Sequence, residues 1–187
     1  MRSHFLLLLL VAFTGSLGAG CDAPKYPPAP ASVPAPGSST TNDPGLVHPL
    51  HLDRAQPKLA TIKLWVGTKE TDAEMCLTMQ QLATGLMFRP GISGNDSMLF
   101  VFPKPQKVAF YMKNVGFDID AAYIDADGII QQIVRLKKMD ATTIYANSDQ
   151  IQYVLETAPG WFEQNGIGVG ALVKSTKRSL PEEFGFN

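Results

Sequence analysis

Short apolar runs separated by turn-forming residues fill the chain after residue 57, and they limit its fold more than any other feature. KLATIKLWV (58–66) alternates apolar and polar residues, which is typical of a strand with one buried face. SMLFVF (97–102) is continuously apolar, which suits a strand covered on both faces. The other expected strands are AEMCL (73–77), VAFYMK (108–113), DAAYID (120–125), IIQQIVRL (129–136), IQYVLE (151–156) and the segment 167–174.

Only two brief helices are expected among these strands. Thr78 followed by Gln81 has the form of a capping box, and Pro90 ends the helix that they begin. Pro159 and Gly166 bound a second helix of one or two turns. This pattern predicts a mainly β fold, a compact β-sandwich or barrel, rather than a βαβ fold.

Residues 1–20 have the pattern of an export signal. Arg2 and His4 precede the apolar FLLLLLVAF (5–13), and small residues lead to Cys21. The apolar part is too short to span a bilayer as a stable helix. Gly-Ala-Gly-Cys resembles the lipobox of bacterial lipoproteins, so we expect Cys21 to carry a lipid. Cleavage that leaves Cys21 as a plain thiol is the alternative.

The segment 22–57 is rich in proline, mixed with Ala, Ser, Gly and Thr. Such a composition buries too little apolar surface to fold and behaves as an extended spacer. Residues 58–187 then form one β-rich domain of ordinary size. We expect an exported protein of the cell envelope, anchored by lipid to a bacterial membrane and facing the periplasm or the exterior.

Charge and histidine content exclude several kinds of function. The formal net charge is -1 and no long basic run occurs, which argues against a nucleic-acid partner. The three histidines are His4, His48 and His51, all before the domain. The domain therefore has no imidazole to activate a serine or cysteine nucleophile or to bind zinc, and we expect neither a metal nor a cofactor.

Two further patterns have simple structural interpretations. DADG (125–128) resembles half of a calcium loop, but Tyr123 stands where an earlier oxygen ligand is needed, so a hairpin turn is favoured. Core packing is favoured over a soft-metal site for the sulfur-containing residues Met75, Cys76, Met79 and Met87.

Lys113, Asn114 and Asp120 form a polar group around the end of an apolar strand. A lysine there either reaches solvent or meets an acid. Two interpretations stay open from the pattern alone: a structural Lys113–Asp120 pair with Asn114 capping the turn, or a binding site.

Five blocks of sequence resemble those of the domain of unknown function 192 family, an uncharacterised and often exported prokaryotic family. The resemblance covers about residues 59–173. It is carried by GLMFRP (85–90), MLFVFP (98–103), FYMKN (110–114), DIDAAYIDADGII (118–130) and YVLETAPGWFEQNGIGVG (153–170). The chain departs from the family pattern at Ser97, Tyr111, Val115 and Asp118.

The resemblance implies a compact β-sandwich of jelly-roll-like character and no established activity. It also implies that Arg89, Lys113, Asn114 and Asp120 form one polar cluster, with Tyr111 as a stacking face. Such a cluster suits a small polar or anionic ligand, for example a glycan, because arginine binds carboxylate or phosphate in bidentate fashion.

Two other functions stay open, so the sequence does not decide whether the protein is an enzyme. Asp120 is the candidate general acid or base, with Glu156 as a second carboxylate if the two lie close. Alternatively the domain docks a partner protein through exposed apolar residues such as Trp161 and Phe162.

Overall fold

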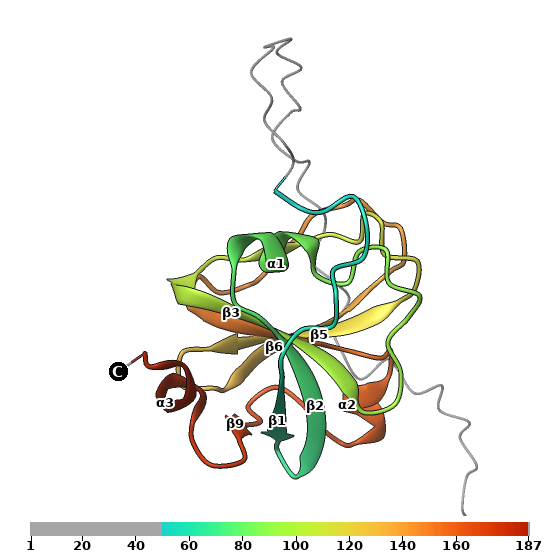
Figure 1. The fold of residues 1–187 in the computed structure, drawn as a ribbon. Coiled ribbons are helices and arrows are strands. Elements are labelled where there is room, and N and C mark those ends of the chain that lie inside the picture. The colour runs from blue at the N-terminus through green and yellow to red at the C-terminus, as the bar shows by residue number, and fades with distance from the viewer. Residues whose placement is uncertain (1–49, 187) are drawn as a thin grey trace, which may run out of the picture.

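The computed structural model describes residues 50–186. The predicted export signal, Cys21 and most of the spacer lie outside the described residues. Within them the fold is mainly β: a seven-stranded mixed sheet curls into a half-barrel, next to a two-stranded sheet and three short helices (Figure 1). The strands are β1 (Thr61–Val66), β2 (Lys69–Cys76), β3 (Asp96–Gln106), β4 (Ala109–Phe110), β5 (Ile119–Asp125), β6 (Ile130–Leu136), β7 (Ile144–Tyr145), β8 (Ile151–Thr157) and β9 (Val173–Ser175). The helices are α1 (Met79–Thr84), α2 (Trp161–Gln164) and α3 (Leu180–Phe184).

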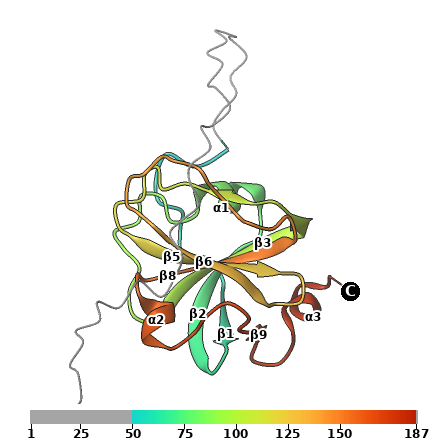
Figure 2. The same ribbon diagram turned by 180° about the vertical axis from the view of Figure 1, so that it is seen from behind.

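The large sheet has the strand order β6-β5-β8-β3-β2-β1-β9, and β4 pairs with β7 in the small sheet. All pairs are antiparallel except β2–β3. Parallel neighbours cannot be joined by a tight hairpin. The chain therefore crosses over between β2 and β3, and this connection contains α1. Figures 1 and 2 both show α1 on one side of the sheet and α2 and α3 on the other.

Each face of the sheet packs against its own hydrophobic cluster. One cluster contains Leu99 and Tyr153 from the sheet, and Phe162 of α2. The opposite cluster contains Phe100 and Val154, with partly buried residues of α1 and β4 packed against it. Side chains alternate between faces along a strand, so strands between two clusters are apolar throughout. This explains the continuous apolar runs of β3 and β8.

Several local predictions are confirmed. Thr78 and Gln81 form the predicted capping box of α1. The hairpin β5–β6 turns at Gly128, whose φ of 84° suits glycine. The second predicted helix is present as α2. Trp161 and Phe162 are buried in the core, so neither is available to dock a partner.

The predicted sandwich or barrel is right only in being mainly β, because one half-barrel sheet accounts for most of the structure. β3 continues to Gln106, beyond the expected strand 97–102. Its pairing with β8 is irregular between Val101 and Gln106, and prolines are tolerated there. The segment after Phe110 turns instead of extending β4, and β9 is shorter than predicted. A third helix, α3, was missed although Ser179 and Glu182 form a capping box.

The start of the described chain already contacts the domain. The Leu52 amide donates to the Thr84 hydroxyl at 3.1 Å, and the buried Gln56 side chain donates to the Gly85 carbonyl at 2.8 Å. The spacer was predicted to continue to Pro57, so these contacts lie before the predicted boundary. None of the helices within residues 50–186 is long and apolar enough to cross a membrane.

Candidate functional site

The buried Asp120 forms an ion pair with Arg135, whose side chain is partly exposed. Its carboxylate accepts hydrogen bonds from Arg135 Nε at 2.7 Å and Nη2 at 3.0 Å, and from the Gly160 amide at 2.7 Å. The residue is 1% exposed. These bonds connect β5, β6 and the start of α2. The structural Lys113–Asp120 pair considered from the sequence is therefore wrong, because Arg135 takes the place of Lys113.

Arg89 is held in a second bidentate pair. Its Nη1 lies 2.6 Å from Glu74 Oε1 and its Nη2 lies 2.8 Å from Glu74 Oε2. The Leu59 amide also donates to Glu74 at 2.7 Å. Burial alone would raise the pKa of Glu74, but the bonds from Arg89 and Leu59 lower it overall. The guanidinium expected to bind an anion is thus neutralised by a carboxylate of the protein.

The other predicted site residues lie around the turn after β4. Lys113 is exposed. Asn114 has a φ of 63°, and its carbonyl accepts a hydrogen bond from the Phe88 amide at 2.8 Å. Tyr111 is 39% exposed. The structure brings neither Arg89 nor Lys113 into hydrogen-bond contact with Asp120, so the predicted cluster does not converge. Ligand binding by these residues stays a prediction.

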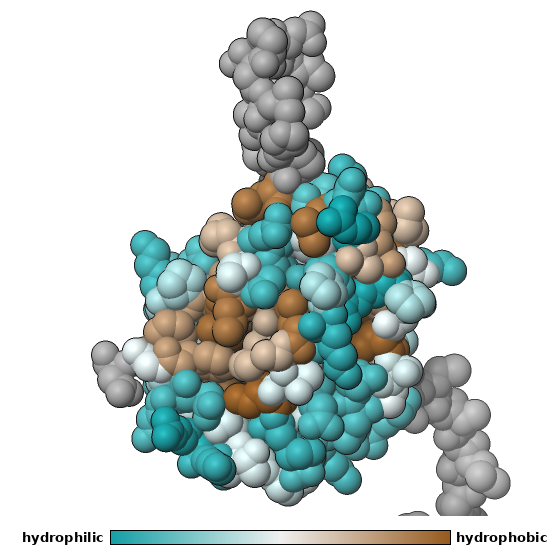
Figure 3. Space-filling model, in the orientation of Figure 1, coloured by the Kyte–Doolittle hydropathy of each residue, from teal (hydrophilic) through white to brown (hydrophobic). Residues whose placement is uncertain are grey.

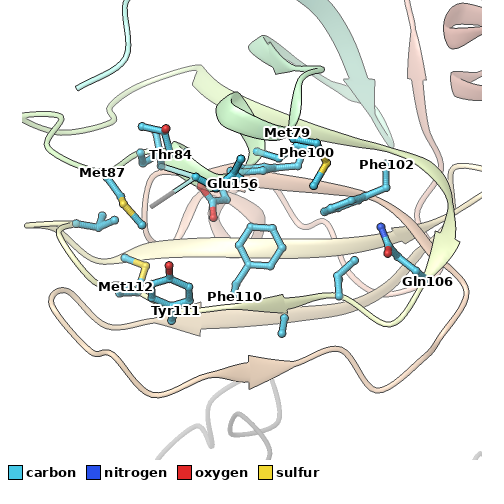
Figure 4. Close-up of a pocket in the computed structure, with 18 of the residues that line it drawn as sticks. Met79, Thr84, Met87, Phe100, Phe102, Gln106, Phe110, Tyr111, Met112 and Glu156 are labelled. Atoms are coloured by element: carbon cyan, nitrogen blue, oxygen red, sulfur yellow. The ribbon is translucent and has the colours of Figure 1, made fainter. Parts of the chain in front are cut away.

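A cavity of about 500 Å³ opens beside α1, between that helix, the end of β3 and β4. This is an ordinary volume for a small-molecule site. Figure 3 shows that apolar surface gathers below α1 on this face. Aromatic rings and methionine side chains dominate the lining (Figure 4): Phe100, Phe102, Phe110, Tyr111, Met79, Met87 and Met112.

Glu156 of β8 lines this cavity and points its carboxyl group into it (Figure 4). The residue is 4% exposed, and its carboxyl group has no hydrogen bond or ion pair with any residue in the range 50–186. Burial raises its pKa to about 8. At neutral pH the side chain is therefore mostly a neutral acid without a protein partner among the described residues.

Two more ionisable groups are buried on this side of the sheet. The Tyr123 hydroxyl has no hydrogen-bond partner within the described chain. Burial is the larger cause that raises the pKa of Tyr123, and the negative charge of Glu156 is the smaller one. The same two causes raise the pKa of Cys76 to about 12. Cys76 is thus the buried, inert thiol that the sequence predicted.

The remaining sequence predictions concern turns and metals. Asp125 Oδ1 accepts hydrogen bonds from the Asp127 amide at 3.0 Å and the Ile129 amide at 2.9 Å, which confirms its role in the turn. Among the described residues, no three His, Cys, Asp or Glu side chains are grouped as metal ligands would be. Met79 is 62% exposed at the cavity rim, so core packing was the wrong interpretation for it.

Sequence reasoning named Glu156 only as a possible partner of Asp120 and missed the cavity. The available signal was one acid inside the apolar strand IQYVLET (151–157), where all seven residues are buried. A charged residue is almost never fully buried without a partner. The cavity itself had no signal, because the segments that enclose it are far apart in the sequence.

Residues 62–175 match the family model DUF192, described as "Uncharacterized ACR". The chain belongs to this family. The match agrees with the sequence resemblance, and the family description assigns no activity. No curated protein matches the chain.

Two crystal structures share this fold. One is a "putative transcription regulator" from Sinorhizobium meliloti 1021, with 24% identity and a TM-score of 0.61, covering 65% of this chain and 98% of that chain. The other is a protein of unknown function from Novosphingobium aromaticivorans DSM 12444, with 25% identity and a TM-score of 0.58, covering 62% of this chain and 85% of that chain. The matched fold makes up almost all of the first of these two chains.

Proposed function

We propose that this DUF192 protein is a small-molecule-binding protein of the bacterial cell envelope, in which the cavity beside α1 is the binding site. In the proposal, a lipid on Cys21 and the proline-rich spacer hold the domain at a membrane. The single observation that carries the binding function is Glu156: an acid with no partner, at the inner end of an apolar cavity. A ligand group in the cavity could form the hydrogen bond with the Glu156 carboxyl that no residue in the range 50–186 supplies.

This proposal moves the site away from the cluster predicted by sequence. The charges of Arg89 and Asp120 are already paired with Glu74 and Arg135. A polar or anionic ligand at those residues would have to displace bidentate ion pairs. The cavity needs no such rearrangement, because it is open at a rim that includes Met79 and Tyr111.

Binding of an uncharged fluorescent probe, N-phenyl-1-naphthylamine, to residues 50–187 tests the proposal. Ala83 of α1 lines the cavity, so Ala83→Trp fills part of it. Ala141 is exposed and does not line the cavity, which makes Ala141→Trp the matched control. We expect saturable binding to the wild type and the control, and roughly tenfold weaker binding to Ala83→Trp. Absence of binding, or equal binding by both variants, would overturn the proposal.

A further inference from the structure

Among the residues in the range 50–186 that line the cavity, Glu156 is the only acid. The only basic residue of that lining is Lys107, which is exposed. Burial alone raises the pKa of Glu156, and no nearby cation lowers it. A cationic group on a ligand would therefore supply the counter-charge that an ionised Glu156 lacks among the described residues.

The lining favours positive charge as well as apolar groups. Three of its aromatic residues, Phe100, Phe110 and Tyr111, present π-electrons, and a cation over an aromatic face is attracted to it. Phe100 and Phe110 meet edge to face with ring centroids 5.0 Å apart, which fixes their orientation. Methionine sulfur atoms are polarisable and adapt to ligands of irregular shape.

The lining is poor in groups that would bind an anion. Its side-chain donors are Thr84, Gln106, Tyr111 and the exposed Lys107, and the Thr84 hydroxyl already donates to the Gln80 carbonyl at 2.8 Å. An anionic ligand would bring a second negative charge toward Glu156 or force that acid to stay protonated. Like charges that are close and shielded from water disfavour each other.

We propose that the ligand of this cavity is an organic amine, with an apolar ring-containing body among the aromatic and methionine side chains and one protonated nitrogen that donates a hydrogen bond to Glu156. This inference rests on the proposed function and specifies its ligand class. The ammonium group supplies both the hydrogen-bond donor and the counter-charge that Glu156 lacks, and such charge-assisted bonds are stronger than neutral ones.

Binding of a protonated amine should then release one proton from Glu156 to solvent. In the empty protein at neutral pH, Glu156 holds its proton, since its pKa is about 8. When the protonated amine binds, the carboxyl proton passes to solvent and the amine keeps its own. Calorimetry at pH 7 in buffers of different ionisation enthalpy should therefore detect proton release on amine binding and none on binding of a neutral ligand.

Three ligands with one body and different head groups test the inference: 2-(1-naphthyl)ethylamine, 2-(1-naphthyl)ethanol and 1-naphthylacetate. Each is titrated calorimetrically at pH 8.5 into residues 50–187, because Glu156 is then largely ionised while an alkyl amine, like lysine with a pKa of about 10.4, stays protonated. The variant Glu156→Gln keeps the shape of the neutral acid. Glu163→Gln removes an exposed acid outside the cavity and is the matched control.

We expect the amine to bind wild type and Glu163→Gln at least about tenfold more tightly than the alcohol, and the acetate to bind most weakly. In Glu156→Gln the amine should lose this advantage while the alcohol still binds. Equal binding of amine and alcohol by the wild type, or an amine preference that survives in Glu156→Gln, overturns the amine inference but leaves the binding site in place. Failure of all three ligands together with the naphthyl probe overturns the proposed function itself.

Discussion

Asp120 and Glu156 lie on neighbouring strands, β5 and β8, and their side chains project from opposite faces of the same sheet. Asp120 is paired in register with Thr157, whereas Glu156 is paired with Ala121. Because side chains alternate along each strand, the two carboxyl groups are separated by the sheet itself. They cannot act together on one substrate, which removes the paired-carboxylate mechanism. Asp120 is paired with Arg135, and Glu156 lies in the cavity.

Asp120→Asn should weaken the fold without changing the cavity. The variant removes the charge that pairs with Arg135 but keeps a side chain that can accept from the Gly160 amide. We expect the free energy of unfolding in urea to fall by about 1–3 kcal/mol, because Asp120 is buried while Arg135 is partly exposed to water. Binding of N-phenyl-1-naphthylamine should not change.

The matched control for that variant is Asp118→Asn. Asp118 pairs with Lys137 at the surface, so the loss should stay below about 1 kcal/mol. A variant Asp120→Asn that is as stable as the wild type but no longer binds the ligand would support the binding site predicted from the sequence.

Glu156 should make the protein less stable as the pH rises. The folded protein keeps the carboxyl proton up to about pH 8, whereas the unfolded chain releases it near the ordinary pKa of 4.5. Between these values the folded state binds more protons than the unfolded state, so the free energy of unfolding falls with increasing pH. The total change is on the order of a few kcal/mol and ends above pH 8.

Thermal unfolding of wild type and Glu156→Gln from pH 5.5 to 8.5 measures this effect. The melting temperature of the wild type should fall across the range by more than that of the variant. The lowered pKa of Glu74 does not interfere, because its stabilisation is complete above about pH 4.5 and is lost only at lower pH. Parallel curves for the two proteins would show that Glu156 is not a desolvated acid.

Cys76 should react with thiol reagents only when the domain opens. The side chain is fully buried, and burial is the main cause that raises its pKa to about 12, so little thiolate forms at pH 8. With residues 50–187, which contain no other cysteine, a disulfide reagent should modify less than one thiol per chain in native buffer and one in urea. Rapid reaction of the native protein at pH 8 would contradict the buried position.

Lipidation of Cys21 is a separate prediction for the full chain in a bacterial host. Incorporation of radiolabelled palmitate should occur in the wild type and in Cys76→Ser, but not in Cys21→Ser. The labelled proteins should sediment with membranes. Equal labelling of Cys21→Ser would place the lipid elsewhere, and an unlabelled wild type would favour simple cleavage before Cys21.

The capping box of α1 and the turn of the β5–β6 hairpin were predictable, because all the residues that form each of them lie within one short segment. Thr78 and Gln81 lie three residues apart, and Gly128 lies within its own hairpin, so their roles follow from spacing alone. Ion pairs formed between segments were not predictable. Asp120 pairs with Arg135 rather than Lys113 because β5 and β6 place Asp120 and Arg135 opposite each other.

The cavity shows the same limit at a larger scale. Its walls come from α1, β3, β4 and β8, which meet only because β2 and β3 run parallel and carry α1 across the sheet. Periodicity gives the buried face of each strand but not the volume left between elements. The one signal of the site within a single segment was Glu156, an acid in the apolar strand β8. That signal points to a site only when the structure shows that Glu156 has no partner among the described residues.

The most direct test of the account is the methyl spectrum of methionine by nuclear magnetic resonance, recorded for residues 50–187 during titration with 2-(1-naphthyl)ethylamine. Met79, Met87 and Met112 line the cavity, whereas Met75 and Met139 do not, so the chain contains its own controls. The account predicts saturable shifts of the three cavity methyl signals at one common affinity, with the signals of Met75 and Met139 unmoved. Shifts confined to Met139, or no saturable shift of any cavity methyl, would contradict it.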